Sequence, residues 1–216
     1  MVINLGTQNS IVNQFISELR DASVQADSLR FRRNMERLGE IFAYEISKKL
    51  EYEEREFVTS LGTAVVPVLK QFPIIGTILR AGLPLHQGML NFFDHSDNAF
   101  VTAYREHRKD DEFAVQVEYA SCPELESKVL ILCDPMLATG HSMFSSYKEL
   151  LIQGKPAHTH LVSVLASIQG IEYLKRVMPK KGVTIWVGAI DDELTAQGYI
   201  VPGLGDAGDL AFGKKA

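Results

Sequence analysis

The sequence has little of what extracellular, membrane-spanning or nucleic-acid-binding proteins depend on. Its two cysteines, Cys122 and Cys133, make no Cys-x-x-Cys and have no histidine at metal-ligand spacing, which argues against a disulfide framework and a zinc site. No unbroken apolar run approaches the roughly 18 residues of a membrane-spanning helix. The formal net charge of −5 gives no overall attraction to nucleic acid. We therefore expect neither a membrane nor a nucleic-acid partner.

The start of the chain also lacks the features of a secretion signal. Met1 to Gln8 has neither a charged beginning nor a long apolar core. Together with the scarcity of cysteine, this predicts a cytoplasmic protein. The composition, 46% hydrophobic and 23% charged, is ordinary for a globular protein, and the length suits a single domain over residues 1–216.

The alternation of strand and helix patterns predicts an α/β fold. Apolar runs recur from residue 74 onward, and segments with helical spacing separate them. This order favours a mainly parallel central sheet flanked by helices. The expected strands are 74–79, 99–104, 113–119, 129–133, 160–166 and 183–190. The expected helices are 10–21, 27–50, one beginning at Pro84, 143–151, and one that follows 168–170 and ends near 177.

Two further segments are expected to lie outside this sheet. Short β patterns at 57–59 and 64–69 predict a projecting β arm, which follows a charged turn at 51–55. The unbroken run of titratable residues at 105–112 is typical of a solvated loop. It could also serve as a mobile cover that orders over a substrate and excludes water.

The strand at 129–133 leads into a segment suited to binding a phosphate. Asp134 follows the strand, and small or turn-forming residues precede the helix expected from Met143. Backbone N–H groups in such a loop and at a helix N-terminus point at an anion, and the helix dipole adds to the attraction. Small side chains at Ala138, Gly140 and Ser142 allow close approach. On these residues alone, an ordinary strand-to-helix turn explains the segment equally well.

A glycine-rich segment at 198–209 is a second candidate ligand loop. So many glycines disfavour a strand or helix, because each loses backbone entropy on ordering. A flexible tail is the alternative. Against it, Tyr199, Ile200, Val201 and Leu204 favour burial. We therefore expect a loop of defined shape.

Four motifs resemble those of the uracil phosphoribosyltransferases. Residues 134–140, Asp-Pro-Met-Leu-Ala-Thr-Gly, are similar to that family's phosphoribosyl diphosphate loop, and 79–83, Leu-Arg-Ala-Gly-Leu, to its second signature. Tyr104-Arg105 matches a pair that meets the diphosphate, and 202–209 matches the uracil-binding loop. The resemblance extends over nearly the whole chain.

The resemblance implies a type I phosphoribosyltransferase fold, with a β arm that helps dimerise and a C-terminal base-binding loop. It implies transfer of the phosphoribosyl group of phosphoribosyl diphosphate to uracil, giving UMP and diphosphate, with Asp206 and Arg105 catalytic. It also implies Mg²⁺ carried largely by the substrate, no protein metal site, and a homodimer or higher homo-oligomer. The implied uracil contacts are Ile200, Gly205, Asp206 and Ala207. The implied phosphoribosyl diphosphate contacts are Arg80, Arg105, Asp134, Pro135, Met136, Leu137, Ala138, Thr139, Gly140, His141, Ser142 and Asp206.

Three positions depart from the family pattern. Residues 167–170, Ser-Ile-Gln-Gly, replace a Pro-Glu-Gly-like turn, and Thr195 replaces an asparagine, so we assign no role to them. His141 replaces a glycine, and two interpretations of it are open. Its imidazole either points to solvent or lies beside the ribose phosphate, where protonation would strengthen binding.

Two other functions remain open at this point. One is a regulatory relative that senses uracil nucleotides and binds RNA, against which the acidic charge and the complete uracil loop argue. The other is a phosphoribosyltransferase for a different base.

Overall fold

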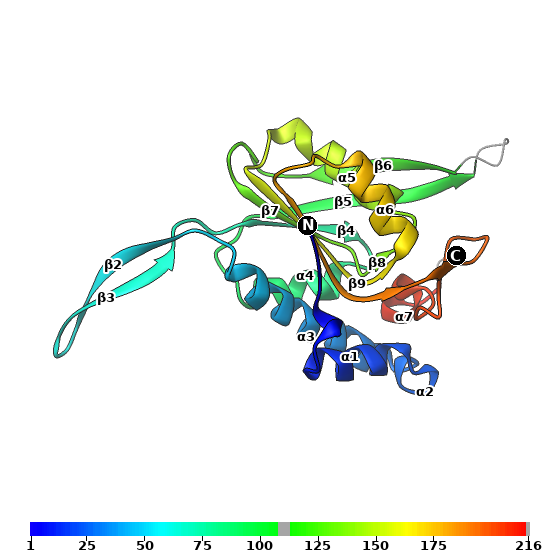
Figure 1. The fold of residues 1–216 in the computed structure, drawn as a ribbon, viewed down its shortest axis with the longest axis horizontal. Helices are drawn as coiled ribbons and strands as arrows, with labels where there is room; N and C mark the ends of the chain where they lie inside the picture. Colours follow the sequence, from blue (N-terminus) through cyan, green and yellow to red (C-terminus); the bar gives the residue numbers. More distant parts are fainter. Residues whose placement is uncertain (108–112, 215–216) are drawn as a thin grey trace.

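The computed structural model describes residues 1–107 and 113–214; over 103–107 and 113–117 it describes the backbone only. Within these ranges an eight-stranded sheet has the order β1-β10-β9-β7-β4-β5-β6, with β8 paired to β9 (Figure 1). Every pairing is parallel except β5 with β6. The predicted mainly parallel α/β fold is therefore confirmed. The strands are β1 Val2–Asn4, β4 Ile74–Leu79, β5 Asn98–His107, β6 Phe113–Ser121, β7 Val129–Cys133, β8 Met136–Leu137, β9 His158–Ser167 and β10 Val183–Asp191.

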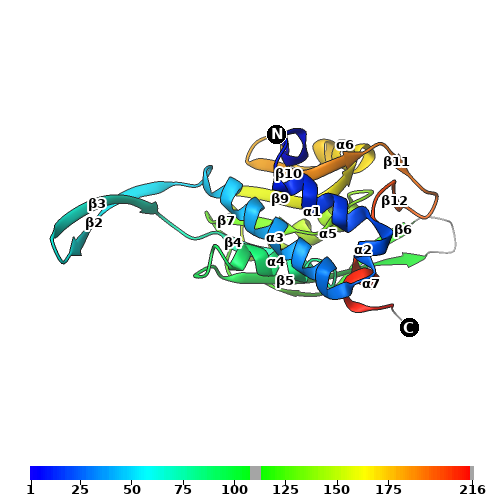
Figure 2. The ribbon, with the colours of Figure 1, turned by 90° about the horizontal axis from the view of Figure 1, so that it is seen from below.

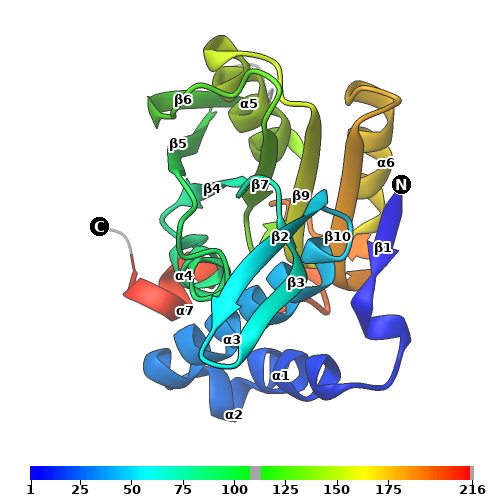
Figure 3. The ribbon, with the colours of Figure 1, turned by 90° about the vertical axis from the view of Figure 1, so that its left-hand side faces the viewer.

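Helices cover both faces of this sheet (Figures 1 and 3). On one face lie α1 Ile11–Arg20, α2 Ala22–Gln25, α3 Ser28–Ser47, α4 Leu83–Leu90 and α7 Ala207–Phe212. On the other lie α5 His141–Leu150 and α6 Ile168–Val177. Short 3-10 helices, η1 Leu5–Thr7 and η2 Leu151–Gln153, follow β1 and α5. Each face has its own apolar core, one built on α1, α3 and α4 and the other on α5 and α6.

The first helices begin where the sequence predicts. The Ser10 hydroxyl accepts from the Val12 N–H, and the Asp27 carboxylate accepts from the N–H groups of Leu29 and Arg30. Both side chains satisfy backbone donors that a helix start leaves open. Val12, with Ile16 and Leu19, then faces the core. No helix in the described part of the chain is long and apolar enough to cross a bilayer.

The β arm is a hairpin of β2 Tyr52–Thr59 and β3 Gly62–Leu69 that extends away from the sheet and helices (Figure 2). The charged turn predicted at 51–55 is wrong, because β2 begins at Tyr52 and contains those charges. Both faces of the hairpin are largely open to solvent, so charged side chains fit in the strand without burial. Apolar side chains are exposed there too: Val58 is 90% exposed and Leu61 98%.

Two other boundaries differ from expectation. The charged run predicted as a loop at 105–112 begins inside a strand, since β5 continues to His107; residues 108–112 lie outside the described ranges. The helix expected from Met143 begins at His141, because Gly140 already turns the chain with a φ of 82°. This earlier start brings the helix N-terminus two residues closer to Asp134.

A buried histidine–tryptophan pair joins β9 to β10. The Trp186 indole N–H donates to His160 Nδ1 at 3.0 Å, and the two residues are 2% and 3% exposed. Burial, with a smaller repulsion from His158, lowers the pKa of His160 from 6.5 to about 3. His160 therefore stays neutral in the folded protein at pH values where the unfolded chain takes up a proton.

We predict that His160 makes the fold less stable in mild acid. Because its folded pKa lies below the unfolded value, protons favour the unfolded chain as the pH falls below about 6.5. In His160→Gln, whose side-chain oxygen can still accept from Trp186, the loss of stability between about pH 6.5 and 4.5 should be smaller. Urea unfolding of both proteins across that range is the measurement. Parallel pH profiles would contradict the prediction.

Candidate active site

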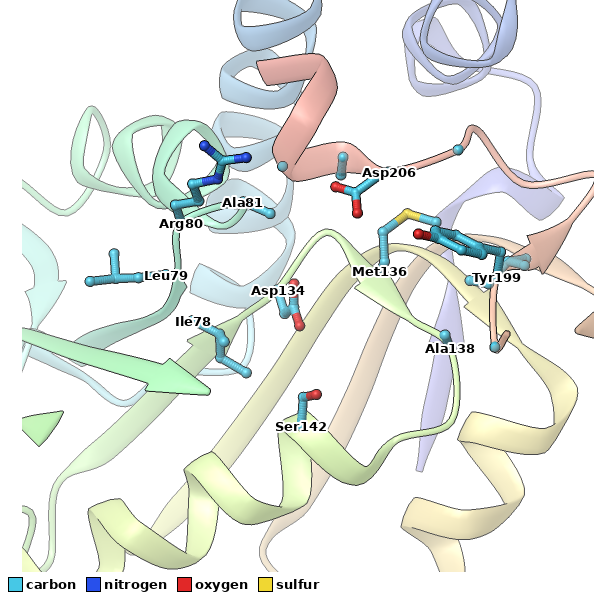
Figure 4. Close-up of a pocket in the computed structure, with 15 residues that line it drawn as sticks. Ile78, Leu79, Arg80, Ala81, Asp134, Met136, Ala138, Ser142, Tyr199 and Asp206 are labelled. Atoms are coloured by element: carbon cyan, nitrogen blue, oxygen red, sulfur yellow. The ribbon is translucent and has the colours of Figure 1, made fainter. Parts of the chain in front are cut away.

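A cavity of about 400 Å³ opens at the carboxyl ends of β4 and β7 (Figure 4). Its walls come from three stretches that are distant in the sequence: 78–81, 134–142 and 198–208. The first two follow the parallel strands β4 and β7, which end at the same edge of the sheet, where open α/β sheets bind ligands. The lining residues are Ile78, Leu79, Arg80, Ala81, Asp134, Met136, Ala138, Ser142, Gly198, Tyr199, Ile200, Gly205, Asp206, Ala207 and Gly208.

The segment after β7 is held to the end of β9 by its backbone. The Asp134 N–H donates to the Val162 carbonyl at 3.0 Å, and the Pro135 carbonyl accepts from Val164 and Leu165 at 3.0 Å each. Then β8 pairs with β9 before Gly140 begins α5. The N–H groups of the first turn of α5 have no partners within the helix. The arrangement therefore offers backbone donors and a helix dipole to an anion.

The structure brings some of the predicted loop residues to the cavity and not others. Asp134, Met136, Ala138 and Ser142 line it. Among the described residues of the same segment, Pro135 and Leu137 are buried in the packing instead, and Thr139, Gly140 and His141 are outside the lining. The contact of these five residues with phosphoribosyl diphosphate stays a prediction.

His141 occupies the first position of α5 and is exposed. Its ring stacks on Tyr173 of α6, with centroids 4.2 Å apart and planes at 32°. Arg176 lies over the same tyrosine ring, 5.6 Å from its centroid. Neither of the two interpretations of His141 anticipated a contact with α6.

The two predicted arginines differ in what the structure records. Arg80 lines the cavity, and its guanidinium donates to Asp209 Oδ1 at 2.8 Å and to the Gly213 carbonyl at 2.6 Å. Both hydrogen bonds come from Nη2 and tie Arg80 to the C-terminal segment, whereas the buried Nε has no hydrogen-bond partner. Arg105 is in β5 opposite Val115, and its side chain lies outside the part of the chain that is described.

The four residues implied to meet uracil, Ile200, Gly205, Asp206 and Ala207, all line the cavity. They belong to the glycine-rich segment at residues 198–209, which we call the base loop. A buried carboxylate anchors this loop. Asp191, at the end of β10, accepts two hydrogen bonds from Arg20, at 2.7 and 2.8 Å, and one from the Gly203 N–H at 3.0 Å. Arg20 also donates to the Gly203 carbonyl.

The electrostatics of this anchor favour the charged carboxylate. Burial alone raises the pKa of Asp191, but the hydrogen bonds from Arg20 and Gly203 outweigh it, so the pKa lies below its ordinary value. An ionised Asp191 therefore fixes the far end of the base loop at neutral pH.

The base loop is more regular than the glycine content suggests. Ile200–Val201 form β12, paired with β11 at Glu193–Leu194, and α7 begins at Ala207. The expectation of a loop without helix or strand is therefore wrong. Of the four residues expected to be buried, Ile200 and Leu204 are 4% exposed, whereas Tyr199 and Val201 are 47% and 38% exposed.

Asp206 has a structural role that sequence reasoning missed. Its Oδ1 accepts from the Asp209 N–H at 3.0 Å, so it caps α7 while its carboxylate lines the cavity. An aspartate is a preferred residue at the start of a helix, where its side chain accepts from the N–H three positions later. Asp206 could therefore have been recognised as a cap from the sequence. No local signal could have paired Arg20 with Asp191, because 171 positions separate them.

The fold and site together define the class. A mainly parallel sheet carries a strand–loop–helix segment at its carboxyl edge, and a second loop lines the same cavity, as in type I phosphoribosyltransferases. A solved structure, described as the AQ2163 protein from Aquifex aeolicus, is similar over 99% of this chain and 98% of its own, with 29% identity and a TM-score of 0.86.

The sequence comparisons identify the family. The family model described as "Uracil phosphoribosyltransferase" matches residues 6–214. A protein of that name from Porphyromonas gingivalis is 51% identical over 99% of both chains. Another, from Methanothermobacter thermautotrophicus, is 36% identical over 95% of this chain and 93% of its own. The chain therefore belongs to the uracil phosphoribosyltransferase family.

We predict that the two roles of Asp206 can be separated. Asp206→Asn keeps an oxygen that can cap α7 but removes the charge, so it should retain most of the stability and lose about 100-fold or more in turnover. Asp206→Ala should lose turnover and also about 1 kcal/mol of stability. Thermal melts and initial rates of UMP formation distinguish these effects. Near-normal turnover in the asparagine variant would show that the negative charge of Asp206 takes no part in the reaction.

Proposed function

We propose that this protein transfers the phosphoribosyl group of phosphoribosyl diphosphate to uracil, giving UMP and diphosphate. One observation carries the proposal: a single cavity is lined by both the loop after β7 and the base loop, so two ligands can meet in it. A sugar phosphate against Asp134 and Ser142 would present its anomeric carbon toward Asp206 on the other side of the cavity (Figure 4).

The expected chemistry is displacement of diphosphate from the anomeric carbon by a ring nitrogen of uracil. Negative charge develops on the leaving diphosphate, and positive character develops on the sugar. Arg80 and Arg105 would stabilise the diphosphate, because planar guanidinium groups donate two parallel hydrogen bonds to such oxygens. Asp134 and Asp206 both line the cavity, and their carboxylates would lie beside the sugar.

Mg²⁺ fits this site as a companion of the substrate. Within the described residues, no group of three or more histidine, cysteine, aspartate or glutamate side chains could hold a metal ion. The two carboxylates of the cavity could contact an ion that is held mainly by diphosphate oxygens and water, which is how Mg²⁺ commonly binds. When bound, it would neutralise charge on the leaving group.

Selectivity for uracil would come from its hydrogen-bonding edge. That edge presents acceptor, donor and acceptor, and successive backbone groups of the loop from Ile200 to Ala207 can supply the complement. Cytosine differs at two of the three positions. In a closed site this mismatch leaves polar groups without partners, which rejects the wrong base strongly.

The decisive experiment incubates the purified protein with phosphoribosyl diphosphate and a panel of bases, with and without Mg²⁺. We predict UMP from uracil, little or no product from cytosine or hypoxanthine, and a large loss of rate when Mg²⁺ is removed by a chelator. Comparable product from another base would overturn the substrate assignment. A titration with RNA at physiological salt tests the regulatory alternative.

We also propose that the arm joins two copies of the chain. An isolated two-stranded ribbon is marginally stable in water, and this one exposes Phe57, Val58, Leu61 and Val65. A second copy would cover these side chains.

The cytoplasmic location stays a prediction from the sequence.

We predict that charge at the tip of the arm dissociates the assembly. Val58→Lys combined with Leu61→Lys should lower the sedimenting mass toward that of one chain, because both side chains would lose an apolar contact. Ile152→Lys is the matched control, since Ile152 is 70% exposed in η2, away from the arm. Equal masses for the arm variant and the control would count against the proposal.

A further inference from the structure

The second half of the loop after β7 is held by one serine hydroxyl. Ser167 is the last residue of β9, is 0% exposed and caps α6. Its hydroxyl donates to the Ala138 carbonyl at 2.5 Å and accepts from the Gly170 N–H at 2.9 Å. One atom therefore ties the loop to the first turn of α6. Ser167 itself does not line the cavity.

The loop and α6 meet backbone to backbone around this serine. A Cβ on Gly170 would clash with the carbonyls of Ala138 and Leu137. A Cβ on Gly140 would lie 3.0 Å from the Gly170 carbonyl, tighter than ordinary packing allows. At Gly170 no side chain separates the two segments, and the Ser167 hydroxyl links them at that point.

The direction of this hydrogen bond determines which way the next N–H points. In a trans peptide unit, the carbonyl and the N–H point in opposite directions. Because the Ala138 carbonyl points at Ser167, the Thr139 N–H of the same peptide unit points away from α6. Ala138 lines the cavity while its carbonyl meets Ser167 and lies against Gly170, so the side of the loop away from α6 is the cavity side.

We propose that Ser167 is a positioning residue that orients the Ala138–Thr139 peptide, so that its N–H faces the bound sugar phosphate and its carbonyl does not. A peptide rotated the other way would present a carbonyl oxygen to the anion, which repels it. The proposal rests on the proposed function only for the identity of the anion. It also gives a role to a residue where the chain departs from its family pattern.

The test compares three variants with the natural protein. Ser167→Ala removes the donor to Ala138 and the cap of α6 together. Ser167→Thr keeps a hydroxyl for both. Ser10→Ala removes the serine cap of α1, far from the cavity, and controls for the loss of a cap alone. The probe is ribose 5-phosphate without uracil, titrated by calorimetry, with the Michaelis constants for both substrates measured in parallel.

We predict that Ser167→Ala binds ribose 5-phosphate about tenfold more weakly, the order expected when one charge-assisted hydrogen bond is lost. The Michaelis constant for phosphoribosyl diphosphate should rise similarly, and that for uracil should change little. Ser167→Thr should restore most of the affinity. Both alanine variants should melt at lower temperature, but Ser10→Ala should bind as the natural protein does.

Two outcomes would overturn the proposal. If Ser167→Ala binds ribose 5-phosphate as the natural protein does, the serine is only a helix cap. If the natural protein does not bind ribose 5-phosphate at millimolar concentration, the peptide faces no sugar phosphate. A natural protein that binds ribose 5-phosphate but converts no uracil would refute the proposed function and leave the role of Ser167 standing.

Discussion

The site depends on how the backbone is satisfied where the chain leaves β7. Buried backbone groups need hydrogen-bond partners, and a loop at a sheet edge has few available. Here β9 extends beyond β7 and supplies them: Asp134 donates to β9, Pro135 accepts from it, and β8 adds a short parallel pairing. The segment is therefore fixed before any ligand binds. The N–H groups of the first turn of α5 have no partners within the helix, and such a helix start suits an anion.

The base loop is fixed by a different interaction, a partly buried ion pair. Asp191 at the end of β10 is 7% exposed, and Arg20 supplies two of its three hydrogen bonds. Such a pair costs desolvation, so its value lies less in net stability than in geometry. The pair links α1 to Gly203 across the end of the sheet. Removing either partner would leave a charge with no compensation and release the loop that lines the cavity.

The sequence predicts local features well and long-range pairings poorly. The strand at 129–133 and the starts of the helices near Ser10 and Asp27 follow from patterns within a few residues, and the structure confirms them. The strand beginning at Tyr52 was missed because an exposed ribbon needs no apolar alternation. The sequence did not predict α7, because the many glycines of 198–209 disfavour a helix although Asp206 caps one there. The contact of Ser167 with Ala138 depends on β8 pairing with β9, which no local pattern encodes.

Arg80 connects the two halves of the cavity. Its guanidinium holds Asp209, and the N–H of Asp209 donates to Asp206, which lines the base side. A diphosphate that binds Nη2 would compete with the Asp209 carboxylate, whereas one that binds Nε would not, because Nε has no partner. Because Asp209 is about a third exposed, water can replace the arginine at modest cost. The exchange is thus accessible at the surface of the cavity, whereas the buried anchor at Asp191 stays in place.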